Sequence, residues 1–192
     1  SPQIPFVVFD LEFTAWEGSM ARRWLGPGEF TEVVQMGAVR LDPITLEELD
    51  WFEVLVKPRL NPVLSDYLVG LTGITNEAVE ARGVDFEAAY RRFVEFARSG
   101  RIIAYGRDDL ILKGNLRLYG IGDAPKLPPY TNVIPWLMAQ GYDLRGLHAC
   151  DVGPLVGAKT HGRQHNALDD ARSVAAGIRT LIAKGAPNIL NG

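Results

Sequence analysis

One strand near the N-terminus constrains this chain most. Residues 6–13 read FVVFDLEF and are apolar except for Asp10 and Glu12. Side chains two apart on a strand share a face, so both carboxylates project together, on the side opposite Phe9 and Phe13. Two like charges in a low-dielectric place are costly unless one is protonated or a cation lies between them. The strand therefore indicates either a hard-cation site, suited to Mg²⁺ or Mn²⁺, or a solvated strand end.

Hydrophobic periodicity predicts strands first, followed by alternating strands and helices. Residues 15–30 contain Gly, Pro and two tryptophans and are expected to form an insertion loop, whereas residues 64–83 read as a loop with one or two short helices. The pattern favours an α/β protein with a mixed sheet flanked by helices. The expected antiparallel strands are residues 6–13, 33–41 and 49–58. The later elements are expected to be a helix from Asp85 that ends at Ser99-Gly100, a strand at 101–106, a helix at 108–120, a mixed element at 132–140 and a last helix at about 166–184.

Length, charge and apolar content narrow the class of protein. With 192 residues, 47% of them hydrophobic, the sequence predicts a single domain over 1–192. The net charge of −3 argues against general polyanion binding, so a nucleic-acid role requires a local basic path. Basic residues are scattered, and most read as solvated surface charges: Arg22, Arg23, Arg91, Arg92, Arg107, Lys113, Arg117 and Arg163.

The N-terminal sequence and the single cysteine bear on location. No run of 18 apolar residues occurs, and SPQIPFVVF has no secretory-signal pattern, so we expect no membrane or export role. Cys150 has no partner for an internal disulfide, which fits a reducing compartment. The sequence favours a cytoplasmic protein and indicates no particular protein partner.

The last predicted helix supplies a third acid. Its apolar residues recur at helical spacing, and at 100° per residue Asp170 lies on the edge of that stripe while Asp169 lies nearly opposite it. Asp169 reads as a solvated charge at the helix start, whereas Asp170 faces inward. His165 precedes the helix and is either a surface residue or a general base beside a metal-bound water.

A fourth acid is expected at the start of the helix at 108–120. Asp108 and Asp109 follow a buried strand, so one can cap the helix while the other reaches the site. Four acids from three segments, together with a histidine, make up the set of groups that a two-metal phosphodiesterase requires.

Three motifs, in order along the chain, resemble those of the DnaQ-like exonucleases of the DEDDh type. FDLEFT resembles the first motif, YGRDDLILKGNL the second, and HNALDDA the third, H-x-A-x-x-D-A. The third motif selects Asp170 over Asp169. The second, W-G-x-Y-D, aligns with Tyr105 to Asp109, so Asp109 inherits the metal role, and Asp108 stands where an aromatic residue is usual.

A further stretch narrows the resemblance. VKPRLNPVLSDYLVGLTGIT, residues 56–75, resembles a stretch of the Eri-like 3′-to-5′ exoribonucleases. The resemblance covers roughly residues 6–181 and implies an RNase-H-like fold with a central mixed five-stranded sheet. It implies a 3′-to-5′ exonuclease that hydrolyses phosphodiester bonds and releases nucleoside 5′-monophosphates, and it favours RNA over DNA as the substrate.

The same resemblance implies individual roles. Two Mg²⁺ or Mn²⁺ ions would be held by Asp10, Glu12, Asp109 and Asp170, and His165 would take a proton from the attacking water. Four residues are expected to contact the terminal nucleotide: Phe13, Thr14, Leu71 and Ile74. Core packing is the alternative for the apolar ones, and the loop between Trp16 and Trp24 either stacks nucleotides or closes the core.

Three other interpretations remain open from the sequence. The first is an exodeoxyribonuclease of the same superfamily, since no clear reader of the 2′-hydroxyl is present. The second is a catalytically silent RNA-binding module on the same fold. The third is a structural zinc site made of His148, Cys150, His161 and His165, although the His-x-Cys spacing is shorter than is usual.

Overall fold

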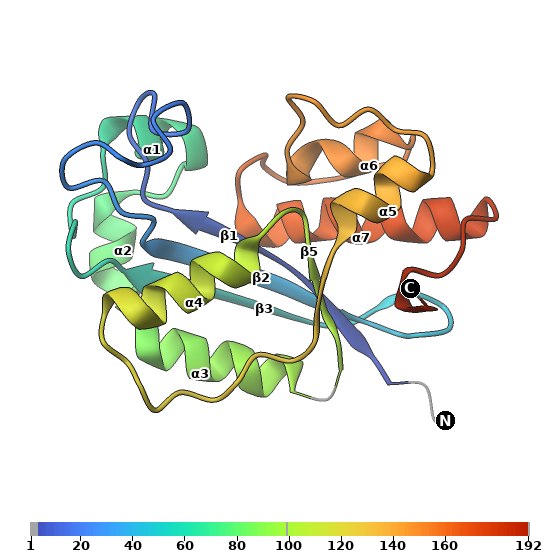
Figure 1. Ribbon diagram of the computed structural model, residues 1–192, viewed down its shortest axis with the longest axis horizontal. Coiled ribbons are helices and arrows are strands. Elements are labelled where there is room, and N and C mark those ends of the chain that lie inside the picture. The colour runs from blue at the N-terminus through green and yellow to red at the C-terminus, as the bar shows by residue number, and fades with distance from the viewer. Residues whose placement is uncertain (1–3, 99, 192) are drawn as a thin grey trace.

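A six-stranded sheet forms the centre of the computed structural model, which describes residues 4–98 and 100–191 (Figure 1). β1, β2 and β3 are antiparallel, and β5 and β6 run parallel to β1. The predicted α/β class and the antiparallel trio are therefore confirmed. The strands lie in the order β4 (Val84–Asp85), β3 (Glu48–Lys57), β2 (Val33–Leu41), β1 (Phe6–Phe13), β5 (Ile102–Ala104), β6 (Tyr130–Asn132).

The sheet has one strand more than the five expected. β4 is only two residues long and pairs with the end of β3 at Val56 and Lys57. A two-residue strand is too short to leave a period-two pattern in the sequence. β6 ends at Asn132, where the expected mixed element at 132–140 begins, and the rest of that segment forms α5 (Val133–Ala139).

Helices cover both faces of the sheet (Figure 1). α3 (Phe86–Ala97) and α4 (Asp108–Leu118) pack on the face that carries Phe9 and Leu11. α5, α6 (Val152–Leu155) and α7 (Ala167–Ala183) pack on the face that carries Phe6 and Val8. Since Asp10 and Glu12 lie on this second face, both acids point toward α7.

A capping contact marks the start of α3, whereas α4 begins after Arg107 with no side-chain cap, so neither Asp108 nor Asp109 caps it. The Asp85 side chain accepts a hydrogen bond from the Glu87 N–H, as expected for an N-cap. The predicted helix end at Ser99 lies outside the described residues, and α3 has its C-cap at Arg98. The remaining elements are α1 (Asp66–Thr72), α2 (Asn76–Arg82), η1 (Ala149–Asp151) and η2 (Ile189–Asn191).

A glycine allows α7 to lie close to the sheet beside Asp10. Gly37 of β2 is the register partner of Asp10, and a Cβ there would lie 2.2 Å from the Leu168 nitrogen. The Ala167 N–H also donates to Gln35 of β2 at 2.9 Å. The first turn of α7, which carries Asp170, is therefore fixed against β2 next to the acids of β1.

The predicted insertion loop after β1 is fixed by hydrogen bonds. Trp24 Nε1 donates to the Thr14 carbonyl at 2.9 Å, and Thr14 Oγ1 accepts from the Glu32 N–H at 3.0 Å. Ser65, the N-cap of α1, donates to the Ala15 carbonyl. These contacts place the loop and α1 side by side beyond the end of β1 (Figure 1).

Candidate nuclease active site

Asp10 and Glu12 lie buried in the C-terminal half of β1, with exposed fractions of 7% and 9%. β1 is antiparallel to β2 on one side and parallel to β5 on the other. In open α/β sheets, ligands bind at the carboxyl ends of strands where the strand direction or order changes. The two acids therefore lie at the position in the sheet where a binding site is expected.

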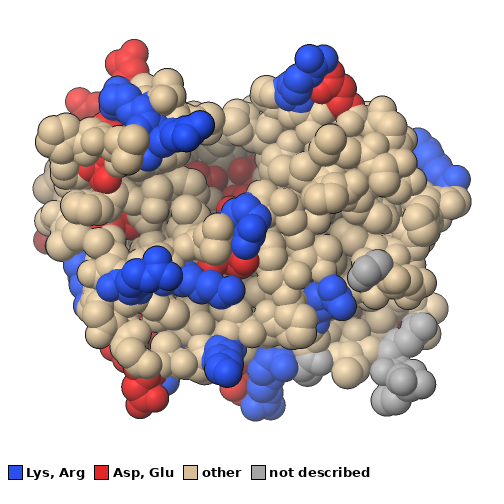
Figure 2. Space-filling model, in the orientation of Figure 1, with Lys and Arg blue, Asp and Glu red and all other residues tan. Residues whose placement is uncertain are grey.

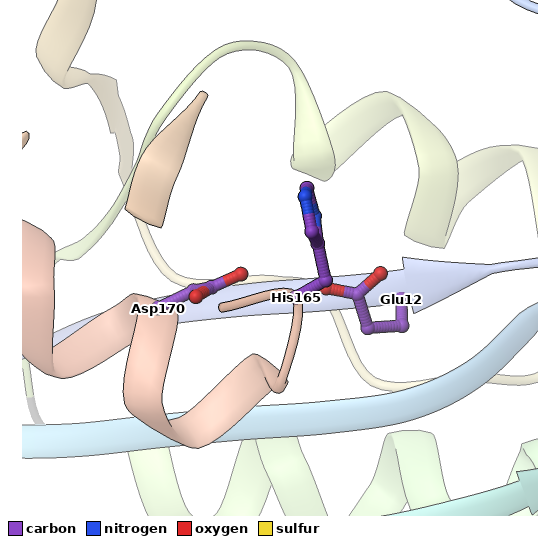
Figure 3. A group of neighbouring side chains, drawn as sticks. All are labelled: Glu12, His165 and Asp170. Atoms are coloured by element: carbon purple, nitrogen blue, oxygen red, sulfur yellow. The ribbon is translucent and has the colours of Figure 1, made fainter. Parts of the chain in front are cut away.

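Asp170 and His165 join Glu12 from the opposite side of the site. Asp170 is in the first turn of α7, and His165 lies just before that helix. One potential ligand atom from each of Glu12, His165 and Asp170 lies within 4.8 Å of the other two. Figure 3 shows Glu12 on β1 and Asp170 on the helix, with the imidazole between them. The structure thus brings together four of the five residues expected at the site, since Asp10 neighbours this group on β1.

The fifth residue differs from the expectation. Asp109 does not line this cavity, because its buried carboxylate receives two hydrogen bonds from the Arg107 guanidinium, at 3.0 and 3.1 Å. Asp108, at the first position of α4, faces the cavity instead. Successive helical residues point about 100° apart, so only one of the two acids can face β1.

Asp108 has an unsatisfied oxygen. Among the described residues, Asp108 Oδ2 is the one buried side-chain nitrogen or oxygen without a hydrogen-bond partner. Native proteins rarely leave such an atom unpaired, and a bound ion is one way to satisfy it. An orphaned oxygen among three other carboxylates is the chemistry that a divalent cation with oxygen ligands would complete, so the residues fit a Mg²⁺ or Mn²⁺ site.

The acids strongly perturb one another. Burial, followed by the charges of Asp108, Glu12 and Asp170, raises the pKa of Asp10 well above its usual value. Burial, followed by the charges of Asp170 and Asp108, does the same to the pKa of Glu12. Burial raises the pKa of Asp108 to about 7 and that of Asp170 to about 7. Such clustering of perturbed carboxylates is typical of functional sites.

His165 is held in an unusual backbone conformation. Its φ of 61° lies in the left-handed region, which residues other than glycine seldom adopt. Burial, and then the neighbouring His148, lowers the pKa of His165, so its imidazole is favoured in the neutral form. The ring centroids of His148 and His165 are 5.8 Å apart.

A cavity of about 680 Å³ opens over these groups. Figure 2 shows the hollow with acidic side chains inside it. Phe13 and Leu71 line the cavity as expected, but Thr14 and Ile74 do not. Thr14 instead bonds within the loop, through the Phe30 carbonyl and the Glu32 N–H, and Ile74 packs in the small core under α1.

The insertion loop forms much of the cavity wall. Trp16, Met20 and Trp24 line it, and the Trp24 ring packs against Phe13 with centroids 5.6 Å apart. Further wall residues that the sequence did not single out are Tyr67 and Tyr105. Tyr105 is the aromatic residue of the motif YGRDD, and Tyr67 lies four residues, about one helical turn, before Leu71. These positions beside expected site residues are the sequence features from which both wall residues could have been predicted.

Arg163, two residues before His165, connects α1 with α7. Its Nε donates to the Thr72 carbonyl at 3.0 Å, at the end of α1, and its backbone N–H donates to Asp169 of α7 at 2.9 Å. Gly73, with φ of 74°, makes room for the guanidinium, since a Cβ there would lie 2.8 Å from Arg163 Nε. Through Arg163, the segment that carries His165 is therefore attached both to the end of α1 and to α7.

The four proposed zinc ligands do not form one group. Among the described residues, the group of potential metal ligands is Glu12, His165 and Asp170. His148 lines the same cavity as His165, whereas His161 lines a different hollow, beside Arg172. Cys150 is buried.

Comparison with known proteins agrees with this geometry. The sequence profile of the exonuclease family (RNase_T) matches residues 7–177, which is most of the chain. The chain belongs to the exonuclease family. This exonuclease-family chain is also similar to the mouse protein named 3′-5′ exoribonuclease 1, with 34% identity over 93 residues. That match spans 48% of this chain and only 25% of the mouse protein.

A fission-yeast relative aligns over more of the chain. The Schizosaccharomyces pombe protein named 3′-5′ exonuclease eri1 is 22% identical over 212 residues, spanning 93% of this chain and 68% of that protein. A solved structure titled as the nuclease domain of 3′hExo, a DEDDh family member bound to rAMP, superposes with a TM-score of 0.79. It is 23% identical, and the match covers 97% of this chain and 95% of that one.

These comparisons confirm the resemblance predicted from the three motifs, to the DnaQ-like exonucleases of the DEDDh type and to the Eri-like group. They also confirm the RNase-H-like fold. No helix in the described part of this exonuclease-family chain combines the length and apolar character that a membrane crossing requires.

Proposed function

We propose that this domain is a metal-dependent 3′-to-5′ exonuclease that acts on single-stranded or overhanging RNA. The observation that carries the proposal is the convergence of Asp10, Glu12, Asp108 and Asp170 with His165 in one cavity. Family membership supports a nuclease, and the names of the mouse and yeast relatives support the polarity and the preference for RNA.

The four carboxylates are the proposed ligands of two Mg²⁺ or Mn²⁺ ions. Asp108 takes the place that the second motif gave to Asp109, because its free oxygen faces the other acids. When bound, the ions would offset the charge of the scissile phosphate and lower the pKa of a water molecule. The acids of the chain hold the reacting groups in one orientation, which is itself a large part of such catalysis.

His165 is the proposed general base. A neutral imidazole nitrogen accepts the proton of the attacking water, and the lowered pKa of His165 keeps that nitrogen free near neutral pH. The water oxygen bonds to phosphorus while the bond from phosphorus to the 3′-oxygen of the preceding nucleotide breaks. The leaving 3′-oxygen takes the bonding electron pair and gains a proton from solvent, to which His165 returns the proton it accepted. The product is a nucleoside 5′-monophosphate and a strand shorter by one nucleotide.

The cavity wall suits the end of a strand. Phe13 and Leu71 offer apolar surfaces for the terminal nucleotide, and Trp16 and Trp24 of the insertion loop offer aromatic ones. Bases stack on such surfaces without strong sequence preference. Thr14 and Ile74 support this wall through the loop and the core, not through contact with the nucleotide.

The test is digestion of 5′-labelled single-stranded RNA and of the matching DNA, with Mg²⁺, with Mn²⁺ or with EDTA. We expect a metal-dependent ladder that shortens from the 3′ end and forms faster on RNA. Equal or faster digestion of DNA would favour the exodeoxyribonuclease interpretation. Binding of either strand without any cleavage would favour the silent RNA-binding module.

A further inference from the structure

A second groove, of about 450 Å³, lies between α4 and the segment 124–130. Lys113 and Leu116 of α4 form one wall, and Lys126 with three prolines forms the other, over Tyr90 and Tyr130. No acidic residue is among the described residues that line it. In a chain with a net charge of −3, a groove lined by two lysines and no acid is a place where an anion is expected to bind.

Two lysines, Lys113 and Lys126, face this groove. Both are exposed, and neither is in an ion pair with any residue that the structure describes. Figure 2 shows basic side chains in a row where α4 crosses this face, next to the hollow that holds the acids. Basic residues that are scattered in the sequence are thus gathered by α4 and its neighbouring segment.

α4 connects the groove with the nuclease cavity. α4 begins at Asp108 in that cavity, and Lys113 follows five residues later, roughly 7.5 Å along the helix axis. Tyr130 lines the groove, and its hydroxyl donates to the carbonyl of Gly106, two residues before Asp108. The exposed guanidinium of Arg107 lies at this junction, because the residue directly precedes Asp108.

We propose that this groove, defined by Lys113 and Lys126, binds the phosphate backbone of the single strand on the 5′ side of the nucleotide held in the cavity. The inference rests on the proposed nuclease function. Ammonium groups on both walls match a phosphate chain, and tyrosine and proline surfaces suit sugars and unstacked bases. RNA and DNA share this backbone chemistry, so the groove contributes affinity for both.

The test compares Lys113→Gln/Lys126→Gln with Arg82→Gln/Arg92→Gln, which removes the same charge from exposed positions on α2 and α3. Binding of a labelled single strand of about 12 nucleotides is measured in EDTA over a range of salt, as RNA and as DNA. We expect the groove variant to bind both strands several-fold more weakly. Its log–log salt slope should fall by roughly 0.7 for each lysine removed. Unchanged binding, or equal losses in both variants, would overturn the proposal.

A second arm measures hydrolysis of a dinucleotide with Mn²⁺. A dinucleotide without a 5′-phosphate has only the scissile phosphate and leaves none for the groove, so the groove variant should cleave it at the wild-type rate, within about twofold. A matching loss on the dinucleotide would mean that the lysines act on the cavity itself, and the inference fails. If the wild-type protein cleaves nothing, the proposed nuclease function fails, while binding in EDTA still decides the groove.

Discussion

Asp108 and Asp109 are neighbours in the sequence, but their carboxylates have opposite surroundings. Asp109 is neutralised by the Arg107 guanidinium, whereas Asp108 keeps an unpaired oxygen toward Asp10 and Glu12. The sequence motif assigned the metal role to Asp109, but it does not define which way each side chain points, since both acids follow the same glycine-containing turn at the start of a helix. Which of the two carboxylates faces the cavity depends on the orientation of the first turn of α4 relative to β1.

Exchanging each of these acids for its amide therefore gives different results. Asp108→Asn should lower the rate of RNA hydrolysis by at least about 100-fold, since it removes a carboxylate that would hold the cation. Asp109→Asn should lose less than about tenfold, since it weakens only the contact with Arg107. Single-turnover rates in Mn²⁺ check both variants, and an Asp109 variant as inactive as the Asp108 variant would restore the sequence assignment.

The same cluster makes the stability of metal-free protein depend on pH. Burial raises the pKa of Asp108 from 3.8 to about 7, so the folded state binds more protons than the unfolded state between these values. The stability gained from protonation is full below about pH 3.8 and is lost as the pH rises through about 7. Asn at this position has no charge to bury at any pH.

In EDTA, Asp108→Asn should therefore melt above the wild-type protein at pH 8 and together with it at about pH 3.5. Added Mn²⁺ should reverse the order at pH 8, because only the wild type has the complete set of acids. Thermal melting at both pH values provides the measurement. Equal melting temperatures at pH 8 in EDTA would show that burial of the Asp108 carboxylate does not destabilise the metal-free protein.

At the scale of elements, the site depends on three segments that meet around His165. α7 lies against β2 because Gly37 has no side chain, and the segment before α7 is attached to the end of α1 by Arg163. α1 also carries Leu71 in the cavity wall. The element proposed to contact the terminal nucleotide and the element that carries the proposed base are thus joined by one arginine.

Replacing Arg163 should impair turnover more than binding. Arg163→Ala should lower kcat roughly 10- to 100-fold with a small change in KM, because His165 loses its fixed position. Arg163→Lys keeps one donor for the carbonyls of α1 and should lose less. The matched control is Arg179→Ala, which also removes an arginine bonded to a carbonyl, that of Leu46, away from His165. Equal kcat losses in both alanine variants would indicate general destabilisation.

At the scale of the whole molecule, the sequence predicted the fold class and three of the site's segments. Asp10 and Glu12 could be placed because strand periodicity fixes their face, and Asp170 because helix periodicity does. The missed features depend on contacts between distant segments. Thr14 bonds back into its own loop, β4 exists only as an addition to β3, and Lys113 and Lys126 share a groove only in the folded chain.

The central claim is that the cavity hydrolyses the last phosphodiester bond at the 3′ end of an RNA strand. The most direct measurement labels the 3′-terminal nucleotide of a single-stranded RNA and identifies the first labelled product formed with Mn²⁺. The account predicts that this product is a nucleoside 5′-monophosphate, released by the wild-type protein and not by Asp108→Asn. A first product that is a free nucleoside, a 3′-phosphate or an internal fragment would contradict it.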